Sequence, residues 1–221
     1  VMWIIGLEGS VRGGIQEYFN DPDLRPVGLD PEARWDDGVV EALSDTTHDE
    51  TEAIAAARRE RRMQAFADRL WEELRGLPDF GFVAERIAIV MAPEGVRIEL
   101  SEAPDQEVFF SLSSAELRAS ARELLTVIAP EVGRSGQTVA IEGHTDARPF
   151  PGSGYTNWDL SAERANRARA LLVEAGVAPE QIAEVRGYAD RQLADPSDPE
   201  AAINRRISIL VHYPEDNERR R

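Results

Sequence analysis

The sequence contains no cysteine, which excludes disulfide bonds and thiolate metal sites. Histidine is also scarce: only His48, His144 and His212 occur, and none stands at a ligand spacing from another. The chain has 25 basic and 41 acidic residues, which gives a net charge of −16. A surface of this charge repels the phosphate backbone of a nucleic acid. We therefore expect no metal, no cofactor and no nucleic acid.

Long apolar runs are missing as well. The opening residues, 1–5, are too short for a signal peptide or a membrane span. They are either an arbitrary start or the last turn of a membrane helix cut upstream, with Trp3 at the interface. The spacing of a short amphipathic helix follows at Val11, Ile15, Tyr18 and Phe19. Such a helix could lie on a membrane, on a partner or on its own domain.

The middle of the chain changes from linker-like to helical. Residues 22–50 are acidic and rich in proline, with little periodicity, and therefore predict a linker or a disordered segment. Helical periodicity resumes near Thr51 and stops at Gly76 and Pro78. Its apolar face consists of Met63, Phe66, Ala67, Leu70 and Leu74. We expect this helical lead-in to occupy 51–84.

Strands and helices alternate between residues 85 and 214. Strands are expected at 86–91, 96–100, 138–142, 183–187 and 206–213. Helices are expected at 113–133, where Ser113 and Glu116 would form a capping box, and at 160–175. The pattern predicts an α/β fold with helices packed on one mixed β-sheet, preceded by a helical and disordered N-terminal segment. Residues 215–221 predict a frayed tail.

One charged side chain interrupts the apolar face of the 160–175 helix. Arg164 lies in line with Leu160 and the alanines and leucines that follow it. A buried charge needs a partner, and the candidate is Asp146, just beyond the strand at 138–142. The two could simply pair, or they could stand apart and bind the carboxylate and ammonium of a zwitterion. In the second case backbone N–H groups near Leu160 and Ser161 would add donors.

Several separated motifs now carry a resemblance to OmpA-like peptidoglycan-binding domains, spread over residues 85–213. They are Gly143-His144-Thr145-Asp146, Asn157, Leu160-Ser161, Arg164-Ala165 and Asn204-Arg205-Arg206. The resemblance implies that Asp146 and Arg164 bind the free amino and carboxyl ends of diaminopimelate in the cell-wall stem peptide. It also implies that Thr145, Asn157 and Arg206 line the same pocket.

A finer resemblance concerns the MotB branch of that family, the flagellar stator subunits. Residues 94–98, 154–166 and 204–211 are similar to it, and the start of the chain resembles its membrane-helix exit and plug, here 1–21. The resemblance implies a homodimer that pairs with a MotA-like membrane subunit and anchors an ion-driven motor to peptidoglycan. It further implies a periplasmic domain held by an inner-membrane helix upstream of residue 1.

Three other interpretations compete with this one. An enzyme could use His144 and Asp146, but a metal site needs at least three converging ligands, so we expect no catalysis. A general envelope-tethering or secretion-system adaptor could carry the same domain without a motor. A pocket that has lost its ligand would leave a domain used only for dimerisation.

Overall fold

The computed structural model describes residues 37–78, 80–104, 108–111, 113–150 and 154–214. The chain divides into two units, Val1–Thr51 and Glu52–Arg221. The second unit contains the β-sheet and the helices that pack on it. The expected amphipathic helix at 11–19 and the frayed tail at 215–221 lie outside the described residues. Among the described helices, none combines the length and the apolar character needed to cross a membrane.

A single five-stranded mixed sheet forms the centre of the second unit, in the order β1-β2-β5-β3-β4. The strands are β1 (Ile87–Ala92), β2 (Gly95–Ser101), β3 (Val139–Gly143), β4 (Ile182–Gly187) and β5 (Arg206–His212). Strands β3 and β4 pair in parallel, and the other neighbours are antiparallel. A parallel neighbour needs a crossover connection, which α5 (Asn157–Glu174) supplies. The predicted α/β class is confirmed.

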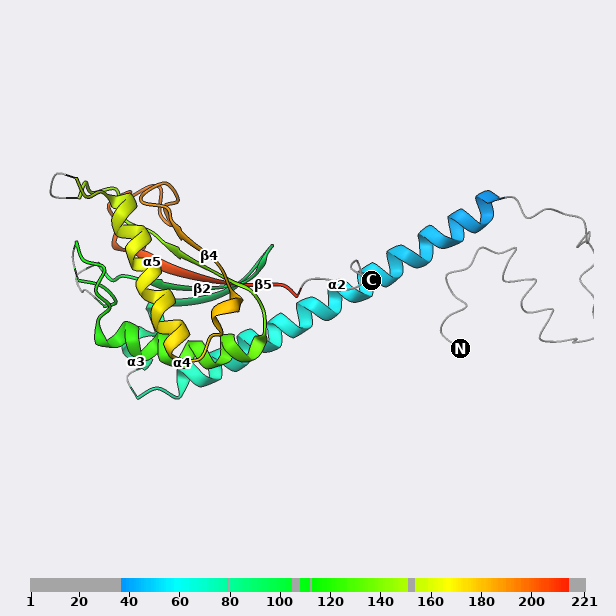
Figure 1. Cartoon of the computed structure of the whole chain (residues 1–221), viewed down its shortest axis with the longest axis horizontal. Helices are drawn as coiled ribbons and strands as arrows, with labels where there is room; N and C mark the ends of the chain where they lie inside the picture. The colour runs from blue at the N-terminus through cyan, green and yellow to red at the C-terminus, as the bar shows by residue number, and fades with distance from the viewer. Residues whose placement is uncertain (1–36, 79, 105–107, 112, 151–153, 215–221) are drawn as a thin grey trace, which may run out of the picture. The chain divides into compact units, whose positions relative to one another are not determined.

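The core lies between the sheet and its helices. Alternate strand residues such as Ile98, Ile141 and Ile209 point into it, because side chains of a strand alternate between two faces. They meet buried residues of α2 (Asp37–Arg75), α4 (Ala119–Ser135) and α5, including Leu124 and Leu172. Figure 1 shows α4 and α5 lying beside the sheet. The short helix α3 (Phe80–Val83) precedes the first strand along the chain.

Helix α2 (Asp37–Arg75) begins well before Thr51, so the predicted linker at 22–50 is wrong for its second half. Proline marks residues 22–31, whereas residues 37–50 contain none and include good helix formers. The prediction had treated 22–50 as one acidic, proline-rich stretch with little periodicity, and therefore as a linker or disordered segment. The predicted apolar face of the later part is confirmed: Met63, Phe66, Ala67, Leu70 and Leu74 are all buried.

The predicted capping box at Ser113 and Glu116 is also wrong. Helix α4 starts only at Ala119, and Ser113 has a backbone φ of +54°, which no helix start uses. Residues before the helix instead form an extended segment, in which Leu117 bridges to Phe110. The helix also continues past Gly133 to Ser135 and ends at the left-handed Gly136.

Two glycines allow α5 to lie directly on the strands that flank the candidate site. A Cβ on Gly143 would stand 2.0 Å from the carbonyl oxygen of Ser161, and a Cβ on Gly187 would stand 2.6 Å from the nitrogen of Ala162. The helix itself begins at Asn157, earlier than predicted, because Thr156 and Asp159 form a reciprocal capping box. This start and this close approach fix where the side chains of the first turns point.

Candidate ligand-binding site

A cavity of about 210 Å³ opens where β3 ends and α5 begins. Five of the residues predicted from the sequence line it: Thr145, Asp146, Asn157, Leu160 and Arg164. The other lining residues are Ser113, Arg148, Pro149, Phe150 and Arg205. The edge of the sheet predicted to carry the site therefore does carry a cavity.

Asp146 is buried, and its carboxylate is held by arginines other than Arg164. Its Oδ2 lies 2.9 Å from Nη1 of Arg205, and its Oδ1 accepts the backbone N–H of Arg148 at 3.2 Å. Nε of Arg148 is 3.8 Å from Oδ2 and lies also 3.5 Å from Glu200. A carboxylate offers about four lone-pair directions, so Asp146 keeps acceptor capacity toward the cavity.

Arg164 is only 2 % exposed and is held by backbone rather than by a carboxylate in contact with it. Its Nε donates to the carbonyl of Ser114 at 2.9 Å, and Nη2 donates to that of Ser111 at 3.4 Å. The guanidinium lies 4.7 Å from the ring centroid of Phe110, a cation–π distance. Burial lowers the pKa of Arg164 to about 10, and the charge of Glu102 opposes that shift.

Two buried polar atoms of the cavity have no hydrogen-bond partner among the described residues. They are Nη1 of Arg164 and Oγ1 of Thr145. Buried donors are nearly always satisfied in folded proteins, so such atoms mark places where a ligand or water belongs. The pairing of Asp146 with Arg164, one of the two alternatives left open by the sequence, does not occur. The two groups stand apart in one cavity.

Ser161 and Arg206 do not line this cavity. Ser161 is fully buried, donates to the carbonyl of Trp158 and accepts the backbone N–H of Ala189, so it joins α5 to the loop after β4. Arg206 reaches Glu99 at 3.4 Å on the sheet face away from the core. Its neighbour in sequence, Arg205, occupies the predicted place, because consecutive residues of an extended chain point to opposite sides.

The predicted backbone donors at Leu160 and Ser161 are also wrong. The N–H of Leu160 already bonds the carbonyl of Thr156 at 3.0 Å, because the helix starts at Asn157 rather than at Leu160. Asn157 shapes the loop before the helix, since its amide donates to the carbonyls of Asp146 and Arg148.

Glu102 is a further functional residue that the sequence did not reveal. It is 3 % exposed and accepts three consecutive backbone N–H groups, from Val108, Phe109 and Phe110, at 2.7 to 2.9 Å. It therefore holds the segment on which the Arg164 guanidinium packs. Nothing in its sequence neighbourhood distinguishes it from other acidic residues.

Comparison with known proteins identifies the family of the domain. Residues 109–206 match the model of the OmpA family. They form an OmpA family domain. This stretch includes every predicted site residue, so the family resemblance inferred from the motifs is confirmed.

Relatives of the chain include motility and envelope proteins. Flagellar export/assembly protein LafU of Escherichia coli O44:H18 (strain 042 / EAEC) is 35% identical over 55% of this chain. Motility protein B of Escherichia coli (strain K12) is 29% identical over 96% of this chain and 72% of its own length. Peptidoglycan-associated lipoprotein of Pseudomonas aeruginosa is 35% identical over 46% of this chain and 59% of its own. The chain spans only 39% of LafU.

Solved structures share the fold. A MotB-like protein from Desulfovibrio vulgaris superposes with a TM-score of 0.56 at 22% identity, covering 71% of this chain and 99% of that one. The cell wall anchor of the T6SS from Pseudomonas aeruginosa superposes with a TM-score of 0.51 at 27% identity, covering 62% and 92%.

Proposed function

We propose that this OmpA family domain binds the free zwitterionic end of diaminopimelate in the stem peptide of peptidoglycan, without catalysis. One observation carries the proposal: a buried carboxylate, Asp146, and a buried guanidinium, Arg164, line one small cavity without pairing with each other. Nη1 of Arg164 and Oγ1 of Thr145 have no partner among the described residues.

In this proposal, different groups of the cavity bind the two charged groups of the ligand. The ligand carboxylate would bond Nη1 of Arg164 and the hydroxyl of Thr145, and its ammonium would bond the remaining lone pairs of Asp146. Because Arg164 has already lost its water, its charge-assisted bond to a carboxylate is stronger than the same bond at the surface. Arg205, which also lines the cavity, donates to Oδ2 of Asp146 and fixes the direction of its carboxylate.

We further propose that the domain anchors a flagellar stator to the cell wall. In this proposal the chain continues upstream into an inner-membrane helix, the domain lies in the periplasm, and two copies assemble with a MotA-like subunit. The similarity to Motility protein B supports this, because it extends over nearly the whole chain and beyond the family domain.

Co-sedimentation with purified diaminopimelate-type peptidoglycan tests the binding proposal. Wild type should pellet, and Asp146→Asn and Arg164→Lys should remain largely in the supernatant, because each keeps the side-chain volume but loses a required charge or fork. Asp68→Ala and Arg169→Ala are matched controls, since both remove one charge at sites that do not line the cavity. Circular dichroism checks the fold of each variant. Pelleting of both cavity variants at the wild-type level would refute the proposal.

A second candidate is a wall anchor without a motor. The 27% identity to the cell wall anchor of the T6SS favours it, because that protein is named for anchoring alone. Complementation separates the two: a full-length gene that restores swimming to a stator-deficient strain supports the stator, and wall binding without swimming supports the tether.

A further inference from the structure

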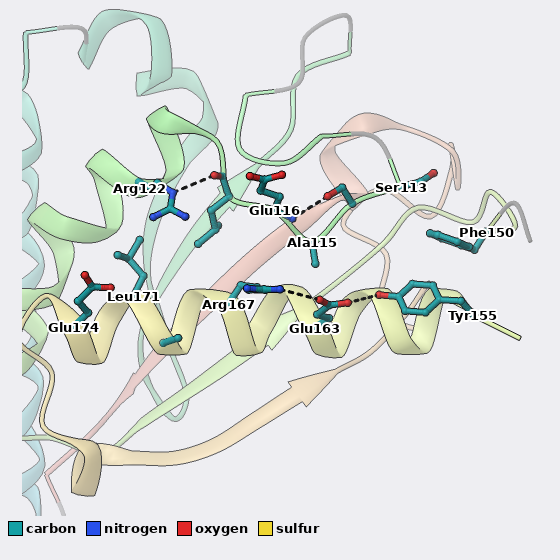
Figure 2. A pocket seen from close by; sticks show the side chains of 13 residues that line it. Ser113, Ala115, Glu116, Arg122, Phe150, Tyr155, Glu163, Arg167, Leu171 and Glu174 are labelled. Carbon is teal, nitrogen blue, oxygen red and sulfur yellow. Dashed lines mark hydrogen bonds and ion pairs between the residues drawn. The ribbon is translucent and has the colours of Figure 1, made fainter.

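A second and larger hollow, of about 690 Å³, shares lining residues with the cavity. Figure 2 shows the side chains that line this second hollow. We call it the α5 groove. One wall is the face of α5 that carries Glu163 and Arg167, together with Tyr155 just before the helix, and the other is the extended segment 113–117 together with Arg122. In Figure 2 the side chains of Glu116 and Arg122 stand across from those of α5.

The groove and the cavity share part of their lining. Ser113 and Phe150 belong to both. Phe150 packs on Tyr155 with ring centroids 4.7 Å apart, so an aromatic pair stands where the two hollows meet. The groove therefore offers the remainder of a ligand fixed in the cavity by Asp146 and Arg164 a continuous path past this point.

Arg167 is the cation of the groove nearest to the anchoring arginine along the helix. It follows Arg164 by three residues, a spacing at which side chains on a helix are neighbours about 5–6 Å apart at Cβ. Arg167 pairs with Glu163 at 3.4 Å, and both side chains are well exposed. An exposed pair of this kind is worth little, so Arg167 can exchange it for a ligand carboxylate.

Glu163 does not lose its last partner in such an exchange. The hydroxyl of Tyr155 donates to its other oxygen at 2.7 Å. Burial and the neighbouring Glu163 raise the pKa of Tyr155 to about 12, so the phenol keeps its proton and remains a donor. Rearrangement of Arg167 therefore leaves the rest of the groove wall in place.

We propose that the α5 groove is a second subsite, which binds the stem-peptide residue next to diaminopimelate through a salt bridge from Arg167 to that residue's free carboxylate. In a stem peptide this neighbour is a glutamate linked through its γ-carboxyl, so its α-carboxylate is free unless it is amidated. The subsite rests on the proposed function, since the cavity sets the position of the ligand. It makes the domain selective for walls in which this carboxylate is not amidated.

Isothermal titration calorimetry on the 221-residue chain tests the subsite with three ligands. They are free meso-diaminopimelate, the tripeptide L-Ala-γ-D-Glu-meso-diaminopimelate, and the same tripeptide with the glutamate carboxylate amidated. Wild type should bind the acid tripeptide about fivefold tighter than the amide, the factor for one exposed ion pair. Arg167→Ala should abolish this ratio while its affinity for free diaminopimelate stays unchanged. Arg169→Ala, which removes an arginine of the same helix outside both hollows, should keep the ratio.

Failure of the subsite differs from failure of the site. Equal affinities for acid and amide in wild type, or a ratio that survives Arg167→Ala, would overturn the subsite. If free diaminopimelate still bound in an Arg164-dependent way, the proposed function would stand. Absence of binding by all three ligands would overturn both.

Discussion

Replacing Gly143 by alanine should force α5 away from the sheet. A Cβ there would stand 2.0 Å from the carbonyl oxygen of Ser161 and 2.9 Å from its carbonyl carbon, whereas real Cβ atoms essentially never approach closer than 3.0 Å. The strand or the helix must therefore move by about 1 Å in a close-packed core. Overpacking costs about 1–3 kcal/mol, and we expect about 3 kcal/mol because the obstacle is backbone rather than a flexible side chain.

Urea unfolding followed by circular dichroism measures this loss. In thermal unfolding, a loss of about 3 kcal/mol in the free energy of unfolding lowers Tm by about 6–12 °C for a unit of this size. Gly81→Ala is the matched control, since a Cβ there meets nothing within 4 Å, and its stability should change by less than about 1 kcal/mol. Gly143→Ala should also weaken diaminopimelate binding, because a displaced α5 carries Arg164 with it. Wild-type stability of Gly143→Ala would refute the close contact on which the site geometry rests.

Three further variants probe the supports of the site. Glu102→Gln should lower the free energy of unfolding in urea by about 2–3 kcal/mol and weaken ligand binding, because an amide cannot accept all three backbone N–H groups; an unchanged urea midpoint would contradict this. Asn204→Ala should cost about 2 kcal/mol, since its buried amide bonds the loop at Asp195, Asp198 and Pro199, and a loss below about 0.5 kcal/mol would count against that role. His144→Phe should flatten the acid dependence of stability. Burial, followed by Arg206 and Arg97, lowers the pKa of His144 to about 3, so only the unfolded chain gains its proton as pH falls from 6.5. Wild type should therefore lose about 1.4 kcal/mol per pH unit more than the variant between pH 6 and 4, and parallel profiles would refute this.

The sequence predicted the helices and strands that have a clear hydrophobic periodicity. It also predicted Arg164, the charged residue that interrupts the apolar face of α5. The periodicity of α5 identified Arg164 because a helix repeats its faces regularly, and the strand before Asp146 was a continuous apolar run. It could not tell whether the two charges pair, because spacing along the chain does not fix the direction of a side chain. In the structure Arg164 donates to the backbone carbonyls of Ser111 and Ser114 instead of pairing with Asp146. No sequence pattern predicts such contacts.

The errors have separate physical origins. The choice of Arg206 over Arg205 depended on where β5 starts, and neighbouring residues of an extended chain point to opposite sides. The false capping box arose because Ser-x-x-Glu also occurs in extended segments, where tertiary contacts override a local preference. Glu102 was not predicted as a site residue because its role depends on burial. The burial of a single acidic side chain follows from tertiary packing, which the sequence pattern does not reveal.

Arg164 and Arg167, two of the three arginines of α5, differ in hydration, and in the proposed function this difference would separate affinity from selectivity. Arg164 is buried, Glu102 stabilises its charge, and its Nε and Nη2 donate to backbone carbonyls, so a ligand carboxylate would meet a group that has already lost its water. Arg167 is exposed, and it must give up both water and Glu163 to bind. In the proposed function the cavity would therefore hold any stem peptide that carries the zwitterion. The proposed subsite in the groove would add only a small difference in affinity between stem peptides. That difference would depend on whether the glutamate carboxylate is free or amidated.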